Sequence, residues 1–317
     1  MFSTKKRTYK QHYNEKDSFY KYSSPKFTEQ EELSENINTD ICIVGGGLTG
    51  ISAALNLADQ GYDVCILEAN KIGSGASGRN GGQLGIGMRK DQLYLENKFG
   101  FEKAEFFWNI GLDAVKNVTN LISKHNIDCA LKPGILHAGN TKKDYKFFLE
   151  EIEHMKSKYN YDNYEYFDEN AIKDEVNTDQ YYSGLLTKDS FHLNPLKLTY
   201  GLANQCLSKG IKIFENSPID KIEEKGNDIL LFSKNVVIKS KKVIIACNGY
   251  LDDLLGSVSN FFMPINNYII ATEPLGEKLA RQIIKKNCGV VDSRFMIDYY
   301  RFSEDHRLLF GLSLIHI

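Results

Sequence analysis

The clearest pattern in the chain lies in residues 40–68, where two short apolar runs flank one amphipathic segment. Residues 41–44 and 64–67 are apolar and rich in β-branched side chains, which predicts two strands buried on both faces of a parallel sheet. A helix is expected over residues 48–60, ending at Gly61. Its apolar positions recur at helical spacing: Ile51, Ala54, Leu55 and Ala58. The stretch therefore predicts a compact β-α-β unit.

Further elements are expected along the rest of the chain. Helical patterns cover residues 91–125, 142–159 and 195–209, the last with Asn194 as cap and Pro195 in the first turn. Strand patterns occupy residues 128–139 (a pair broken at Pro133-Gly134), 164–167, 182–193, 211–214, 219–239 (an antiparallel meander), 242–249, 263–272, 295–302 and 307–314. The first 38 residues are polar and lack periodicity, which indicates an arm.

This order predicts an α/β protein in which a Rossmann-like fold is interrupted by a long insertion. The Rossmann-like domain is expected to comprise residues 37–95 and 190–258. An inserted α+β domain, built on an antiparallel or mixed sheet, is expected from residues 96–189 and 259–317, with residues 1–36 as the arm.

The length and net charge of the chain indicate how many domains it has and what kind of molecule it binds. A chain of 317 residues is long enough for about two domains. Its 39 basic and 41 acidic residues give a net charge of −2, which offers no electrostatic case for binding nucleic acid or an anionic membrane. A small-molecule partner is expected.

The six cysteines are scattered without C-x-x-C pairs, and three of them fall inside apolar strand patterns. This usage indicates a reducing compartment and no metal site. Apolar runs of membrane-spanning length and a signal-peptide pattern are both missing from the sequence, so the cytoplasm is the expected location.

The turn after the first predicted strand carries the most specific chemistry. Gly45, Gly47 and Gly50 fit G-x-G-x-x-G, in which the glycines allow a tight turn, close approach of a pyrophosphate and close packing of the helix. The helix N-terminus favours the negative charge of that pyrophosphate. Glu68 follows the second strand, where a carboxylate can accept hydrogen bonds from an adenosine ribose. The alternative is a glycine-rich turn that binds nothing.

A second glycine-rich stretch, residues 73–87, contains seven glycines and Arg79. Its approachable backbone N–H groups favour a longer cofactor than the first turn alone can hold, which disfavours a plain NAD-binding fold. A flexible linker is the alternative interpretation.

Taken together, the motifs are those of a known family. They lie at residues 43–50, 67–69, 75–83, 193–195, 243–249, 271–275 and 299–302. The chain resembles, from about residue 17 to residue 311, the D-amino-acid-oxidase-like family of FAD-dependent oxidoreductases, and within it the gamma-glutamylputrescine oxidase branch. The resemblance implies that the Rossmann-like domain binds FAD and that the inserted domain binds substrate. The implied FAD-binding residues are Gly45, Gly47, Gly50, Glu68, Ala69, Ser77, Arg79, Asn80, Gly81, Gly82, Ile219, Asn248 and Gly249.

The resemblance also implies a reaction, namely oxidation of a carbon–nitrogen bond in an amine or amino acid by hydride transfer to the flavin. The imine would then hydrolyse, and dioxygen would reoxidise the flavin to give hydrogen peroxide. Two other classes stay open: a nicotinamide-dependent dehydrogenase and an inactive FAD-binding fragment. The second is considered because family members continue past Gly311 with a final FAD-contacting helix, so a C-terminal truncation is expected here.

Candidate catalytic residues are less specific than the FAD motifs. Tyr300 and Arg301 lie on the predicted substrate-side strand, where an arginine can clamp a substrate carboxylate and a surface ion pair is the alternative. His192 and His137 are candidate bases, although a single histidine near a strand is more often structural. Cys247 is disfavoured as a flavin attachment point because its strand is buried.

Overall fold

The computed structural model describes residues 18–312 except 260, 262, 264 and 266. The chain forms two compact units. Unit 1 comprises residues 1–79 and 195–264, and unit 2 comprises residues 80–194 and 265–317. None of the helices in the described residues is both long enough and apolar enough to cross a membrane.

These boundaries differ from the expected ones at 95, 190 and 258. Residues 83 and 84 pair with the end of a unit 2 strand, so the second glycine-rich stretch from Asn80 onward belongs to unit 2. Residues 190–194 finish and follow that same strand, so they also join unit 2. Part of the predicted arm, residues 1–17, lies outside the described residues, and the rest belongs to unit 1.

Unit 1 is built on a six-stranded sheet in the order β7-β2-β1-β10-β9-β8. Its strands are β1 (Ile37–Val44), β2 (Val64–Leu67), β7 (Lys212–Phe214), β8 (Lys221–Lys225), β9 (Asp228–Ser233) and β10 (Val236–Ile245). The pairs formed among β7, β2, β1 and β10 are parallel, whereas β10, β9 and β8 form an antiparallel meander. The two apolar runs of the β-α-β unit are confirmed as neighbouring parallel strands.

One strand of this sheet was predicted as two. The sequence pattern separates the end of the meander from a buried strand at residues 242–249, but β10 runs without a break. One edge of β10 pairs with β9 and the other with β1, so both predicted pieces belong to one extended segment.

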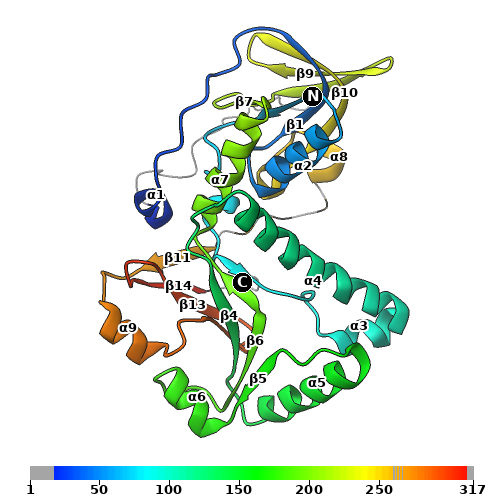
Figure 1. Ribbon diagram of the computed structural model, residues 1–317. Coiled ribbons are helices and arrows are strands. Elements are labelled where there is room, and N and C mark those ends of the chain that lie inside the picture. Colours follow the sequence, from blue (N-terminus) through cyan, green and yellow to red (C-terminus); the bar gives the residue numbers. More distant parts are fainter. Residues whose placement is uncertain (1–17, 260, 262, 264, 266, 313–317) are drawn as a thin grey trace, which may run out of the picture. The chain divides into compact units, whose positions relative to one another are not determined.

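The helices of unit 1 include the one that begins at the glycine turn. They are α1 (Phe19–Ser23), α2 (Leu48–Asp59), α7 (Pro195–Ser208) and α8 (Gly256–Ser259), with 3-10 turns η2 (Ala76–Gly78) and η3 (Asn248–Tyr250). Ile51, Ala54 and Leu55 of α2 are buried, as the apolar spacing predicts. Figure 1 shows α2 packed beside α7, so the predicted helix at residues 195–209 covers the same unit.

Unit 2 is built on a mixed sheet in the order β11-β14-β13-β12-β4-β6-β3, with β5 also paired to β6. Its strands are β3 (Gln83–Leu84), β4 (Lys132–Gly139), β5 (Tyr164–Phe167), β6 (Ser183–His192), β11 (Tyr268–Ala271), β12 (Gly289–Asp292), β13 (Asp298–Phe302) and β14 (Leu308–Leu312). Figure 1 shows the late strands β13 and β14 in the same sheet as β4 and β6, which confirms that the last predicted strands join the insertion.

Two details of unit 2 depart from the sequence pattern. The expected strand pair at residues 128–139 is the single strand β4, in which Pro133-Gly134 causes a shift of register against β6. β12 was not predicted, and it supplies the parallel pairing with β4. Predicted strand positions 264, 266, 313 and 314 lie outside the described residues.

Two of the five helices in the described part of unit 2 contribute to its main core. The five helices are α3 (Gln92–Phe99), α4 (Phe101–Lys124), α5 (Asp144–Tyr159), α6 (Glu169–Glu175) and α9 (Glu277–Ile283). One core cluster joins residues of β4, β6, β12 and β13 to Ile172 of α6 and Ala280 of α9. Unit 1 has its own core around Cys42, Cys65 and Leu231.

Candidate functional site

A cavity of about 160 Å³ opens in unit 1 where β1, β2 and β10 end. This volume is roughly ten times the minimum that a single water needs, so the cavity suits a ligand and is larger than a water site. Ligands of open α/β sheets bind at this carboxyl edge. The cavity is lined by residues 44–47, 67–70, 73–77, 217, 219, 246–248, 250–252 and 254.

The three glycines of the first turn each meet a steric requirement. Gly45 has a φ of +115°, and a Cβ there would lie 2.6 Å from the carbonyl oxygen of Ala246. A Cβ at Gly50 would collide with the carbonyl oxygen of Gly45, so only glycine lets α2 pack this close to the turn. A Cβ at Gly47 would lie 2.7 Å from Oγ of Ser77. Glycine is therefore required by the backbone at positions 45 and 50, whereas at position 47 it leaves room for the Ser77 side chain.

Backbone donors gather at the start of α2. The N–H of Leu48 donates to Oγ of Ser77 at 2.9 Å. Among the described residues, the N–H groups of Gly47 and Thr49 have no hydrogen-bond partner. A pyrophosphate fits this position, because unpaired N–H groups lie at the positive end of a twelve-residue helix that begins at a glycine turn.

Glu68 follows β2 and lines the cavity. Its Oε2 accepts a hydrogen bond from the N–H of Gly46 at 2.7 Å, and its Oε1 accepts one from the N–H of Asn70 at 2.8 Å. Burial raises the pKa of Glu68, and these backbone donors oppose that rise. Each carboxylate oxygen keeps a second lone pair, so Glu68 can hold the glycine turn and still accept a ribose hydroxyl.

The other predicted cofactor residues divide between the two units. Ala69, Ser77, Ile219 and Asn248 line the unit 1 cavity together with Gly45, Gly47 and Glu68. Gly50 and Gly249 do not line it, and Gly50 acts through helix packing. Nε of Arg79 donates to the carbonyl oxygen of Ser74 at 2.7 Å, which anchors the loop that forms one cavity wall.

Sequence reasoning missed several lining residues, including Ser217, Tyr250 and Leu254. A Cβ at Gly75 would lie 3.0 Å from the Tyr250 ring, so this loop fits closely against the tyrosine. The position of Tyr250 directly after Asn248-Gly249 was an available signal, whereas Ser217 and Leu254 carry no motif.

The second glycine turn, Asn80 to Gly82, lies in unit 2. Oδ1 of Asn80 accepts a hydrogen bond from the N–H of Gly82 at 2.8 Å, and Gly82 has a φ of +69°. The carbonyl oxygen of Gly82 accepts from the N–H of Leu193 at 2.7 Å. Hydrogen bonds therefore fix this turn within unit 2, which contradicts the flexible-linker interpretation for these residues.

Arg301 is hydrogen-bonded to the same turn. Its side chain is only 3% exposed, and its Nε donates to the carbonyl oxygen of Gly81 at 2.8 Å. A second nitrogen, Nη1, donates to the carbonyl oxygen of Phe302 at 3.3 Å. Arg301 is therefore buried, whereas the alternative for this residue required an exposed side chain.

His192 ends β6 and is 1% exposed. Its Nε2 lies 2.7 Å from the carbonyl oxygen of Asn287, which identifies Nε2 as the protonated nitrogen, and its Nδ1 has no hydrogen-bond partner in the described structure. Burial and the nearby charge of Arg301 lower the pKa of His192 to about 4. The imidazole is neutral near pH 7, with Nδ1 able to accept a hydrogen bond. The other candidate, His137, is exposed on β4.

Tyr300 points away from Arg301, because neighbouring residues of a strand face opposite sides of the sheet. It belongs to the unit 2 core, where its ring stacks on Phe310 at a centroid distance of 5.7 Å. Its hydroxyl lies 3.0 Å from that of Tyr181, and burial raises the pKa of Tyr300. This packing indicates a structural residue, and a catalytic role for Tyr300 stays a prediction.

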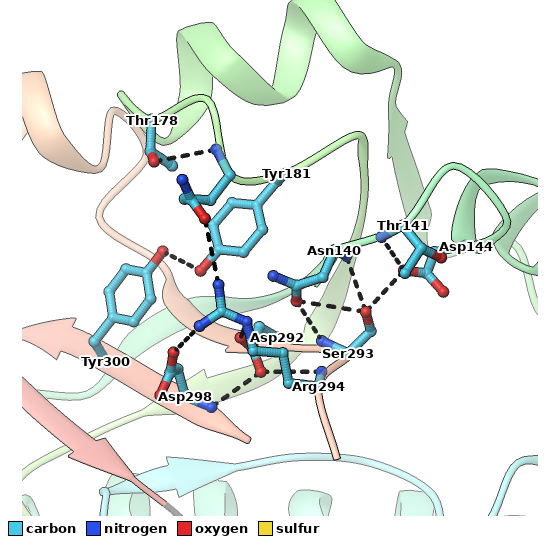
Figure 2. Close-up of polar contacts among 11 residues, drawn as sticks. Asn140, Thr141, Asp144, Thr178, Tyr181, Asp292, Ser293, Arg294, Asp298 and Tyr300 are labelled. Atoms are coloured by element: carbon cyan, nitrogen blue, oxygen red, sulfur yellow. Dashed lines mark hydrogen bonds and ion pairs between the residues drawn. The ribbon is translucent and has the colours of Figure 1, made fainter. Parts of the chain in front are cut away.

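The neighbours of Tyr300 form an ion-paired network rather than an open site. Figure 2 shows Arg294 beside Asp292 and Asp298, with nitrogen–oxygen distances of 3.3 Å and 2.7 Å. Oγ of Ser293 donates to Oδ2 of Asp144 at 2.8 Å, which joins the loop after β12 to the start of α5. The network stabilises this end of the unit 2 sheet.

Comparison with known proteins decides the family. Residues 40–316 match the model of the FAD dependent oxidoreductase family, abbreviated DAO. The chain belongs to this FAD-dependent oxidoreductase family. FAD is accordingly the cofactor, and the glycine turn, the donors of α2 and Glu68 are chemically suited to its adenosine and pyrophosphate.

Two curated relatives span most of the chain. It is 36% identical over 300 residues to gamma-glutamylputrescine oxidoreductase of Escherichia coli K12, a match that covers 94% of this chain and 70% of that protein. It is 35% identical to the probable oxidoreductase OrdL of Haemophilus influenzae, with 88% of this chain and 66% of that protein covered. The chain thus spans about two thirds of the length of these relatives.

Solved structures agree with the fold. Glycine oxidase from Geobacillus kaustophilus has a TM-score of 0.68 at 17% identity, covering 87% of this chain and 71% of the other. L-amino acid deaminase from Proteus myxofaciens has a TM-score of 0.66 at 20% identity, covering 90% and 61%. At these identities the similarity establishes the architecture: an α/β Rossmann-like domain with an inserted α+β domain.

Proposed function

We propose that this family member oxidises a carbon–nitrogen bond of an amine or amino acid, with a gamma-glutamylputrescine-like compound as substrate. The observation that carries the proposal is the 36% identity, along 94% of the chain, to a gamma-glutamylputrescine oxidoreductase. Membership of an FAD-dependent family argues against the nicotinamide-dependent alternative.

Unit 1 would hold the cofactor. Gly47 leaves room for the pyrophosphate, the start of α2 supplies N–H donors, and Glu68 accepts from the ribose. FAD, when bound, would supply the acceptor for the hydride of the amine-bearing carbon, and dioxygen would reoxidise the flavin to give hydrogen peroxide. The imine product hydrolyses in water to a carbonyl compound and a free amine.

Unit 2 would orient the substrate. Arg301 is buried and always charged, so its guanidinium suits the carboxylate of a glutamyl or amino-acid group. The neutral His192 offers Nδ1 as an acceptor for a neutral amine or for water. These roles are proposals for the predicted catalytic residues, and Tyr300 is assigned none.

Anaerobic reduction of the purified chain, loaded with FAD, tests this function. Gamma-glutamylputrescine should bleach the oxidised flavin spectrum, and readmitted air should restore it with one peroxide per turnover. Putrescine, glutamate and glycine serve as comparison substrates, because putrescine has amines without a carboxylate, whereas the two amino acids carry an amine beside a carboxylate. Flavin that stays oxidised with every amine would contradict the proposed reaction.

The remaining alternative is an FAD-binding fragment without turnover. Stoichiometric FAD binding combined with no reduction by any amine would favour it. Absence of FAD binding would contradict both interpretations.

A further inference from the structure

Glu215 directly follows β7 and is a buried carboxylate, only 1% exposed. Its Oε1 accepts a hydrogen bond from the N–H of Ile72 at 2.8 Å. Its Oε2 accepts from the N–H of Gln30 at 3.1 Å and from Nζ of Lys71 at 3.2 Å. A buried charge is costly unless it is paired and hydrogen-bonded, so these three donors together stabilise the Glu215 carboxylate.

Gln30 belongs to the arm, and other residues of the arm also contact the segment that follows β7. The N–H of Glu215 donates to the carbonyl oxygen of Glu31 at 3.2 Å. The N–H of Leu33 donates to Oγ of Ser217 at 2.9 Å, and the Leu33 side chain is buried in the unit 1 core. The arm is thus joined to residues 215–217 at successive positions.

The same short segment forms part of the cavity wall. The N–H of Ser217 donates to the carbonyl oxygen of Glu68 at 2.9 Å, and Ser217 lines the cavity. The N–H of Asn216 donates to the carbonyl oxygen of Asn70 at 2.9 Å. Glu215 therefore lies between the arm on one side and the loop that carries Glu68 on the other.

We propose that Glu215 is a positioning residue that couples the N-terminal arm to the FAD cavity. By binding Gln30, Lys71 and Ile72 at once, it holds the loop of Glu68 and the segment of Ser217 in the arrangement that receives the cofactor. The arm is part of the cofactor-binding apparatus. The inference rests on the assignment of the unit 1 cavity to FAD.

Hydrogen exchange in the full-length chain, with and without FAD, measures the coupling. If the arm and the cavity are coupled, bound FAD must slow exchange at the amides of Gln30 and Leu33, since coupling between two sites is reciprocal. An arm that serves structure alone would gain no more protection from FAD than β8 of unit 1, which does not line the cavity, and that result would overturn the proposal.

Glu215→Gln keeps the size of the side chain but removes its charge and one acceptor oxygen. We expect its Kd for FAD, measured by flavin fluorescence, to rise about tenfold or more, and the FAD-dependent protection of Gln30 and Leu33 to disappear. Glu29→Gln is the matched control, because Glu29 also pairs with Lys71, at 3.5 Å, but is 83% exposed. A folded Glu215→Gln variant with unchanged FAD affinity would contradict the inference.

A second variant covers the case in which Glu215→Gln does not fold. Gln30→Pro removes the N–H that the arm donates to Glu215 and leaves the carboxylate in place. Its FAD affinity should fall severalfold, and an unchanged Kd would remove the arm from the site. If the wild-type chain itself fails to bind FAD, the assignment of the cavity to FAD fails. Faster hydrogen exchange at Leu33 in Gln30→Pro without FAD would even then show that Gln30 helps to hold the arm on residues 215–217.

Discussion

Single residues of the cavity have two functions at once. Glu68 can meet a ribose hydroxyl, yet its two oxygens already accept the N–H groups of Gly46 and Asn70. Ser77 likewise lines the cavity while accepting the N–H of Leu48. We therefore expect substitutions at these positions to change the shape of the glycine turn as well as the proposed contacts with the cofactor.

Gly47→Val should abolish or severely weaken FAD binding. A Cβ at position 47 would lie 2.7 Å from Oγ of Ser77, and the branched side chain would fill the space of the pyrophosphate. Gly256→Val is the control, because a Cβ at position 256 has nothing within 4 Å. Equilibrium dialysis with FAD measures both variants, and a Gly47→Val variant that holds FAD as the control does would show that this turn is structural.

Arg301→Lys should lower kcat/KM for carboxylated amines by about tenfold or more, and leave that for uncharged amines near normal. The lysine keeps the charge but loses the planar fork that can bind a carboxylate through two parallel hydrogen bonds. It also loses the bond to Gly81, so FAD content must be measured alongside the kinetics. Arg281→Lys, on an exposed position of α9, is the control.

Equal losses for both substrate types would contradict a carboxylate-binding role for Arg301. They would assign it instead to the support of the Asn80–Gly82 turn, with which it is in direct contact.

At the scale of elements, the junction of α3 and α5 holds a carboxyl group with a raised pKa. Burial raises the pKa of Glu151 on α5 to about 7, and Asp91, the cap of α3, adds to that rise. His154 opposes it by its positive charge, although its own hydrogen bond is to Glu96, at 2.7 Å. An ionised Glu151 is therefore unfavourable in the folded state.

The sign of the effect on stability follows from the raised pKa. The folded chain binds the proton of Glu151 more tightly than the unfolded chain, so stability is lost as the pH rises from about 4.5 through about 7. Glu151→Gln should remove this loss and gain about 1–3 kcal/mol relative to wild type at pH 8, and little at pH 4.5.

Urea unfolding of the two proteins at both pH values measures the difference. Glu153→Gln, on an exposed position of the same helix, is the control and should follow wild type. A Glu151→Gln variant that also follows wild type at both pH values would show that Glu151 is well solvated.

At the scale of the whole molecule, the two units have separate cores, and the cavity belongs to unit 1. FAD should therefore protect the cavity-lining segments of unit 1 most strongly. At a concentration 100 times its Kd, FAD stabilises the form that binds it by about 2.7 kcal/mol.

Hydrogen exchange with FAD should show slower exchange in residues 44–49, 67–77 and 246–254, with NAD at the same concentration as the control. Equal protection by NAD would contradict the cofactor assignment.

The sequence by itself determined the β-α-β unit and its glycine turn. The strand pattern, the helical spacing of Ile51, Ala54 and Leu55 and the close approach of Gly50 to the carbonyl oxygen of Gly45 all arise within a few residues of the chain. Such local preferences can be read without knowing what packs against them. Glu68 could be placed for the same reason, because it directly follows a recognisable strand.

Tertiary structure decided what depends on pairing between distant segments. The continuity of β10, the position of β12 beside β4 and the unit boundary at Asn80 each depend on a partner strand that no local pattern specifies. Glu215 looks like an ordinary residue at a strand end, yet it binds Gln30 from 185 positions away. A buried carboxylate must find donors wherever the fold places them, and only the folded chain brings those donors together.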